Sequence, residues 1–152
     1  MNRFKLSESV MPPTYFWSLA VASILFHVMF RTETFVPGPY NLSGLFFILA
    51  GIAINLHTDS LFRKHGTTVK PHKKPSKLVI EGSFRYSRHP MYLGMFFALT
   101  GLAVFLGTAV SFVFPVLFFA LMELIFIPVE EETLEREFKS YASYKKKVRK
   151  WL

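Results

Sequence analysis

The feature that most limits the fold of this chain is its series of long apolar runs. Residues 12–30 contain no Asp, Glu, Lys or Arg, and further apolar runs occupy residues 40–61, 90–106 and 109–128. A helix of about 20 apolar residues is long enough to cross a bilayer. Because 51% of the 152 residues are hydrophobic, the chain is too apolar for an ordinary soluble domain. The sequence therefore predicts an all-α integral membrane bundle of four transmembrane helices, formed by residues 1–152 as a single domain.

The charged residues follow a pattern that predicts the topology of this bundle. The formal net charge is +8, and Lys and Arg gather in residues 63–89 and again from residue 135 to the C-terminus. Basic segments beside membrane spans stay in the cytoplasm, where they meet anionic lipids. This pattern favours a membrane protein over a nucleic-acid-binding protein. It predicts a cytoplasmic loop at residues 63–89 and both termini in the cytoplasm, with membrane lipids as partners.

The C-terminal residues 130–150 have the pattern of an amphipathic helix on the cytoplasmic side. The apolar side of this helix consists of Leu134, Phe138, Tyr141, Val148 and Trp151. The chain has no cysteine, and the histidines in and near the basic loop, His57, His65 and His72, lack the spacing of a metal site. We therefore expect no bound metal and no disulfide.

A His-Pro step stands where the basic loop enters the third apolar run, in the stretch RYSRHPMYLG. A residue before proline avoids the helical region, whereas proline is favoured at the first helical position. Pro90 should therefore open the third span, and His89 should lie just outside it. The free N–H groups of the first helical turn, together with Arg85 and Arg88, favour an anion at the membrane surface. The alternative is a basic flank with an ordinary helix start.

Carboxylates follow on the fourth span and just after it. Glu123 lies within the span, and Glu130, Glu131 and Glu132 follow Pro128. If the helix continues through Pro128, Glu123 and Glu130 share a face. The alternative for the three consecutive acids is a solvated first turn of the tail helix. Cations and carboxylates that meet at the cytoplasmic end of the bundle would suit a zwitterion with an extra cationic centre, such as S-adenosylmethionine. The chain has no GxGxxG motif and hence no Rossmann methyltransferase fold.

Two stretches together resemble a known enzyme family. KLVIEGSFRYSRHPMYLG and EEETLEREFKSYASYKKKVRKWL resemble the isoprenylcysteine carboxyl methyltransferases and their phospholipid methyltransferase relatives, especially the small bacterial members. The resemblance covers roughly residues 66–152. It implies an integral membrane methyltransferase, in the inner membrane of a prokaryote, that uses S-adenosylmethionine. The implied pocket is built from the loop, the His-Pro helix start and the C-terminal helix.

The resemblance also assigns residues of this chain to the cofactor. Leu78 and Val79 match positions whose backbone contacts the cofactor, and Phe84 matches an aromatic position of the family. The HPxY cofactor motif corresponds to His89, Pro90, Met91 and Tyr92. Glu130 matches the cofactor-binding glutamate. Beyond the resemblance, methyl transfer to an amine or thiol acceptor needs a general base, for which Glu131 is the candidate, whereas Arg88 could instead steady an anionic acceptor.

Two departures from the family pattern concern the methyl acceptor. The prenylcysteine enzymes carry an arginine four residues before the cofactor glutamate, where this chain has Phe126, and the family's FGxxYxxY stretch is FKSYASY here. The expected acceptor is therefore a lipophilic or amphiphilic small molecule that arrives from the bilayer, and not a prenylated protein. The alternative function is a non-catalytic membrane module that binds anionic lipid or a partner protein through its basic loops.

Overall fold

The structure is a computed structural model that describes residues 11–30, 33–66 and 77–152. Its α-helices are α2 (Pro12–Met29), α3 (Ser43–His65), α4 (Pro90–Leu106), α5 (Val113–Leu121), α6 (Ile127–Glu137) and α7 (Tyr141–Lys147). Turns of 3-10 helix occupy Tyr40–Leu42, Gly82–Arg85 and Ala109–Phe112, and one π-helical turn occupies Met122–Phe126. No strand occurs in the described residues, so the prediction of an all-α fold is confirmed.

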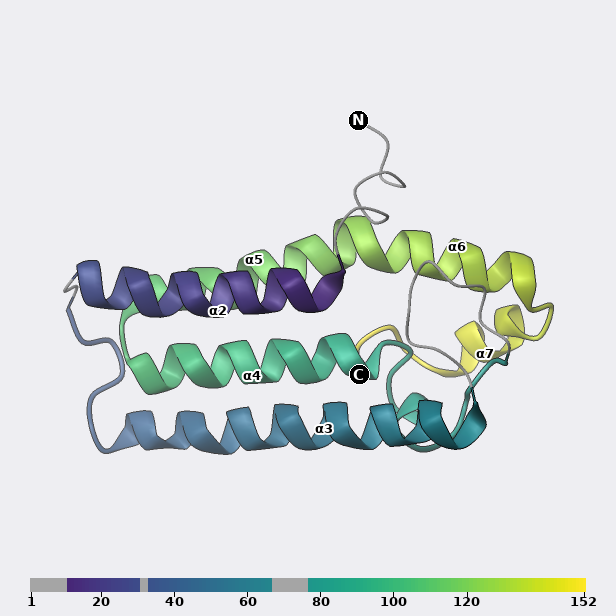
Figure 1. The fold of residues 1–152 in the computed structure, drawn as a ribbon, viewed down its shortest axis with the longest axis horizontal. Helices are drawn as coiled ribbons and strands as arrows, with labels where there is room; N and C mark the ends of the chain where they lie inside the picture. Colours follow the sequence, from purple (N-terminus) through teal and green to yellow (C-terminus); the bar gives the residue numbers. More distant parts are fainter. Residues whose placement is uncertain (1–10, 31–32, 67–76) are drawn as a thin grey trace.

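The long helices lie side by side, with α4 in the middle of the bundle. Figure 1 shows α3 on one side of α4 and α2 with α5 on the other. The main buried cluster joins α4 to the helix that runs from α5 into α6, and its most buried members are Leu99, Phe118, Met122 and Ile127. The start of α4, the end of α3 and all of α6 and α7 lie at one end of the molecule (Figure 1).

Helices α3 and α4 pack unusually closely because glycines face each other at two levels. A Cβ atom on Gly44 would lie 2.4 Å from the carbonyl oxygen of Gly101, and one on Gly51 would lie 2.4 Å from that of Gly94. Both pairs are seven residues apart on their helices, so the same faces meet twice. Small residues at such positions let two helix backbones approach closely, as they do in membrane bundles.

Within the described residues, two helical stretches are long and apolar enough to cross a membrane, Tyr40–His65 and Ala109–Glu137. Helix α4 begins and ends where the third predicted span does and, with 17 residues, is shorter than these two stretches. Large apolar side chains cover the outer faces of α2 and α3; Trp17 is 65% exposed and Phe46 69%. Such surfaces are typical of helices that face lipid. That all four predicted spans cross the membrane stays a prediction.

The fourth predicted span continues beyond residue 128 without a break. The N–H of Ile127 bonds to the carbonyl of Met122, five residues earlier, and α6 then runs through Pro128. A π-helical turn of this kind adjusts the hydrogen bonding of a helix locally. The helix is therefore continuous from Glu123 to Glu130, as the hypothesis that these two residues share a face required.

The predicted single helix over residues 130–150 is wrong. Helix α6 ends at Glu137, because Phe138 has an extended backbone (φ −130°, ψ 107°), and α7 begins only at Tyr141. Residues 148–152, which we call the C-terminal strap, are not helical. Leu134, Phe138 and Tyr141 still pack in one cluster on either side of the break.

Candidate functional site

The candidate site is centred on His89, which the chain places directly before α4. Pro90 is the first residue of the helix, and the carbonyl of His89 accepts the N–H of Leu93 in the first helical turn. His89 has a non-helical backbone, and its N–H donates to Oγ of Ser87 at 3.2 Å. The residue is only 4% exposed. The prediction that Pro90 opens the helix and His89 precedes it is thus confirmed.

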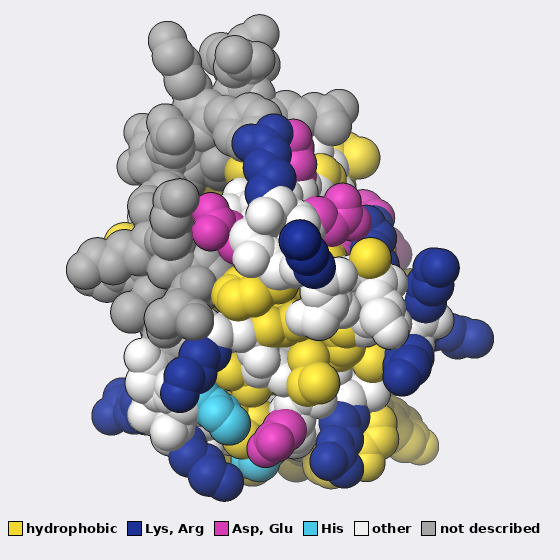
Figure 2. Space-filling model, turned by 90° about the vertical axis from the view of Figure 1, so that its right-hand side faces the viewer, with side chains coloured by type: hydrophobic (Ala, Val, Ile, Leu, Met, Phe, Trp, Pro, Cys, Tyr) yellow, Lys and Arg dark blue, Asp and Glu magenta, His cyan; other side chains and the backbone are white. Residues whose placement is uncertain are grey.

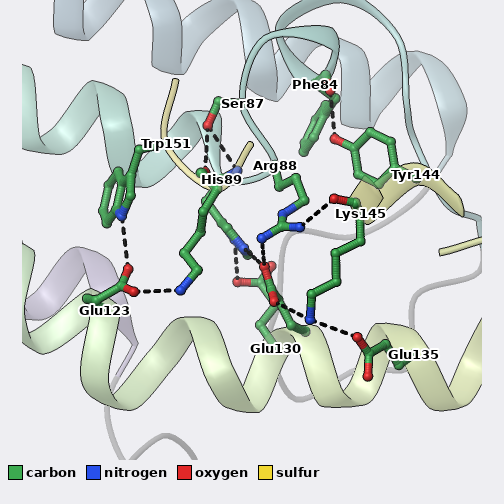
Figure 3. Close-up of polar contacts among 12 residues, drawn as sticks. Phe84, Ser87, Arg88, His89, Glu123, Glu130, Glu135, Tyr144, Lys145 and Trp151 are labelled. Atoms are coloured by element: carbon green, nitrogen blue, oxygen red, sulfur yellow. Dashed lines mark hydrogen bonds and ion pairs between the residues drawn. The ribbon is translucent and has the colours of Figure 1, made fainter. Parts of the chain in front are cut away.

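Two carboxylates from α6 meet the two nitrogens of the His89 ring. Nδ1 lies 3.4 Å from Oε2 of Glu130 (Figure 3), and Nε2 lies 3.3 Å from Oε1 of Glu131. Burial acts to lower the pKa of His89, but the hydrogen bonds and negative charges of the two glutamates outweigh it and raise the pKa. The ring lies parallel to that of Tyr92, with 5.7 Å between the centroids. Charge and stacking together fix the orientation of the imidazole.

Glu131 collects further cations at the same place. Its carboxylate lies 2.8 Å from the guanidinium of Arg88 and 2.9 Å from Nζ of Lys145, and the residue is only 6% exposed. The guanidinium of Arg88 also donates to the carbonyl of Lys145 at 3.1 Å. A buried carboxylate is tolerated when cations and hydrogen bonds compensate for the lost water. Glu131 therefore joins α4, α6 and α7 at this end of the bundle.

The C-terminal strap lies against the residues just before His89. The carbonyl of Arg149 accepts the N–H of Arg88 at 3.0 Å, and the carbonyl of Lys150 accepts the hydroxyl of Ser87 at 3.1 Å. Figure 3 shows the indole of Trp151 reaching Glu123, and Nζ of Lys150 donates to the same carboxylate. The strap therefore touches both chain segments that form the site.

The remaining candidate residues form an apolar cluster next to this polar centre. Val79 and Phe84 are buried there with Tyr141 and Tyr144, and Leu78 packs against them. The hydroxyl of Tyr144 donates to the carbonyl of Phe84 at 2.6 Å, which fixes the 3-10 turn against α7. Burial raises the pKa of Tyr144 to about 12, so the hydroxyl keeps its proton at neutral pH.

Eight of the ten candidate residues from the sequence thus lie in one of two adjoining groups. Arg88, His89, Tyr92, Glu130 and Glu131 form the polar centre, whereas Leu78, Val79 and Phe84 belong to the apolar cluster. Pro90 is fully buried at the start of α4, and Met91, which follows it, is half-buried. Sequence reasoning missed Ser87 and Lys145. The spacing of Ser87, two residues before His89, could have indicated a local side-chain bond to the backbone.

Three buried polar atoms at the polar centre have no hydrogen-bond partner within the described residues. They are Oε2 of Glu130, Nε of Arg88 and the hydroxyl of Tyr141. Burial raises the pKa of Tyr141, and the charges of Glu131 and Glu130 contribute, which places its hydroxyl beside them. Buried polar atoms without partners are costly and therefore rare. One acceptor, one donor and one hydroxyl at this place fit a ligand that carries both an ammonium and a carboxylate group.

Metal binding has no comparable basis in the described part of the chain. None of its His, Asp and Glu side chains form a group of three or more that could hold a metal ion. His72, one of the loop histidines, lies outside the described residues.

Comparison with known proteins assigns the chain to a family. No curated protein and no solved structure matches the chain. The family model of the phospholipid methyltransferases matches residues 39–141, more than half of the chain, and this range contains every candidate cofactor-binding and catalytic residue. The match confirms the family resemblance seen in the sequence. The chain belongs to the phospholipid methyltransferase family.

Proposed function

We propose that this protein transfers a methyl group from S-adenosylmethionine to a lipophilic or amphiphilic acceptor at the membrane surface. Family membership implies methyltransferase activity on membrane lipids. The observation that supports the rest is the arrangement of His89 between Glu130 and Glu131, where Oε2 of Glu130, Nε of Arg88 and the hydroxyl of Tyr141 are buried and make no hydrogen bond. A zwitterionic ligand that carries an additional positive charge would satisfy all of these groups.

Glu130 and Arg88 would hold the two charged ends of the amino-acid part of the cofactor. Oε2 of Glu130 contacts Nδ1 of His89 at 3.4 Å but makes no hydrogen bond, so it could accept one from an ammonium group. Nε of Arg88 also makes no hydrogen bond and could donate one to a carboxylate. The backbone of Leu78 and Val79, with the ring of Phe84, would line the remainder of the ligand. When bound, S-adenosylmethionine supplies a methyl group that a nucleophilic oxygen, nitrogen or sulfur can accept by in-line displacement.

The chain's own residues would act mainly by positioning the reactants and by excluding water. Glu131 was the candidate base, but its carboxylate is engaged by His89, Arg88 and Lys145 at once. A general base needs a free lone pair that faces the methyl acceptor. A carboxylate bound by three cationic partners is instead suited to holding those partners in place. We therefore assign Glu131 to holding His89, and we assign Arg88 to binding an anionic group. The carboxylate of Glu130 directs the ring of His89 from its other side.

The site would lie at the cytoplasmic surface of a four-span protein, with both termini on that side. The crossing helices would be α2, α3, α4 and the continuous helix that contains α5. Figure 2 shows the end of the molecule that carries the site, where Lys and Arg side chains surround an apolar centre. Such a cationic rim suits the anionic face of a membrane. A prokaryotic inner membrane fits this arrangement, and the acceptor would arrive from the bilayer.

Transfer of a labelled methyl group tests this function. Detergent-purified protein would be incubated with S-adenosylmethionine labelled at its methyl group and with a membrane lipid extract. We expect label in the lipid fraction, reduced at least tenfold by Glu130→Gln and unchanged by Glu132→Gln, since Glu132 lies exposed on the same helix and pairs with Arg136. The proposal would be refuted if the lipid fraction carried no more label with the native protein than with heat-treated protein.

A further inference from the structure

The backbone of His89 is connected to the C-terminal strap by two consecutive hydrogen bonds. The N–H of His89 donates to Oγ of Ser87 at 3.2 Å, and the hydroxyl of Ser87 donates to the carbonyl of Lys150 at 3.1 Å. Ser87 is 1% exposed, so water cannot readily replace either bond. The position of the strap is therefore transmitted directly to the residue before α4.

The strap is in turn anchored on the helix that carries the two site glutamates. Nζ of Lys150 lies 2.5 Å from Oε1 of Glu123, and the indole N–H of Trp151 donates to Oε2 of the same carboxylate at 2.9 Å. The indole also stacks on Phe119 of α5, with 4.8 Å between the ring centroids. A carboxylate in an apolar helix is costly unless it is paired, and these contacts supply its partners.

Together these contacts link the two halves of the candidate site. Glu123 and Glu130 lie on one continuous helix, so a strap fixed at Glu123 is fixed relative to Glu130. The other half, His89, sits in a non-helical conformation whose N–H bonds to Ser87. A displacement of about 1 Å at a reacting centre is enough to lower a rate by orders of magnitude.

We propose that Glu123, Lys150 and Ser87 are positioning residues that hold His89 in place opposite Glu130 and Glu131. This inference rests on the proposed function, because the purpose of the alignment is to bind S-adenosylmethionine. Trp151 supports the anchor by its stacking and its indole bond. None of these residues needs to touch the cofactor or the acceptor.

The test compares full-length variants in detergent by titration calorimetry with S-adenosylmethionine. Lys150→Met removes the ion pair and keeps a long side chain, whereas Lys150→Arg keeps the charge. Lys147→Met is the matched control, since Lys147 is an exposed lysine at the end of α7. We expect Lys150→Met and Ser87→Ala to raise the Kd about fivefold or more. Lys150→Arg and Lys147→Met should stay within about twofold of the native Kd.

Thermal unfolding of the same variants separates positioning from stability. A Lys150→Met protein that unfolds at a lower temperature but binds S-adenosylmethionine as the native protein does would overturn the proposal. The strap would then be a stabilising contact without influence on the site. A weakened affinity that Lys150→Arg restores would support it, because a merely structural loss would not follow the charge of one side chain.

A second readout decides the inference even if the native protein binds no S-adenosylmethionine, a result that would count against the proposed function. The ring signals of His89, assigned by their loss in His89→Gln, would be titrated by NMR. The glutamates raise the pKa of this ring, so loosening the strap should move its titration midpoint toward the ordinary 6.5. We expect this shift in Lys150→Met and not in Lys147→Met. An unchanged midpoint in Lys150→Met would overturn the inference.

Discussion

Nε2 of His89 lies 3.3 Å from Oε1 of Glu131, although the two residues are 42 positions apart. One residue immediately precedes α4, and the other lies in α6 beyond the apolar part of its helix. Both are almost fully buried, and Glu130 approaches the opposite ring nitrogen at 3.4 Å. The structure therefore holds an imidazole between two carboxylates, at the end of the bundle where the basic segments gather.

The stability of the protein should depend on pH through His89. Burial acts to lower its pKa, but Glu130 and Glu131 raise it above the ordinary 6.5. A raised pKa means that the protonated ring stabilises the folded state. This contribution is complete below pH 6.5 and is lost as the pH rises through the folded-state pKa. We expect the thermal unfolding midpoint to fall over that interval, and His89→Gln to abolish this part of the profile. Identical pH profiles for both proteins would contradict the assignment.

Replacing Glu131 should cost far more stability than replacing its exposed neighbour. Glu131→Gln leaves Arg88, His89 and Lys145 without their shared anion, and breaking a buried ion pair typically costs about 3–5 kcal/mol. Glu132→Gln changes a surface pair and should have little effect. Chemical unfolding of both variants in the same detergent measures the difference. Equal losses in the two variants would show that the network around Glu131 contributes little.

The close approach of α3 and α4 predicts a steric cost at their glycines. Gly51→Ala would bring a Cβ atom within 2.4 Å of the Gly94 carbonyl oxygen, so the helices would have to separate. Overpacking of this kind typically costs about 1–3 kcal/mol. Ala53→Val adds bulk on an exposed face of the same helix and serves as the control. A stable Gly51→Ala protein with unchanged unfolding would contradict the packing described here.

The hydroxyl of Tyr144 should contribute measurably to the shape of the apolar cluster. Tyr144→Phe removes its bond to the carbonyl of Phe84 and leaves that carbonyl without this donor. Leaving such a group unpaired typically costs about 1–3 kcal/mol. Tyr86→Phe removes a hydroxyl from a residue that is 75% exposed and should be neutral. Unfolding free energies of the two variants provide the comparison, and a neutral Tyr144→Phe would argue against a fixed 3-10 turn.

Local patterns predicted the long helices well. The third apolar run and α4 have the same bounds, because Pro90 at the start of the run and Gly107 directly after it mark its two ends. The His-Pro step predicted the helix start for the same reason. Complementary charge, together with the family resemblance, predicted that His89 and Glu130 would be near each other. The glycines that join α3 and α4 stand in pairs seven residues apart, but the sequence alone does not show that the two pairs face each other.

The tail was predicted poorly because long-range packing decides its path. No proline or glycine marks the break at Phe138, so no local signal predicts that α6 ends at Glu137. Lys145 is one lysine in a basic stretch, and no local pattern distinguishes it as the partner of Glu131. The return of Lys150 and Trp151 to Glu123 likewise joins residues 27 and 28 positions apart. Periodicity alone carries no information about such contacts.

Binding of S-adenosylmethionine to the detergent-purified protein, measured by titration calorimetry, tests the central claim most directly. We expect the native protein to bind, and His89→Ala and Glu130→Gln each to weaken binding tenfold or more, equivalent to about 1.4 kcal/mol. Glu132→Gln should bind as the native protein does. A folded native protein that binds no S-adenosylmethionine, with or without added membrane lipids, would contradict the account, as would unchanged affinity in both site variants.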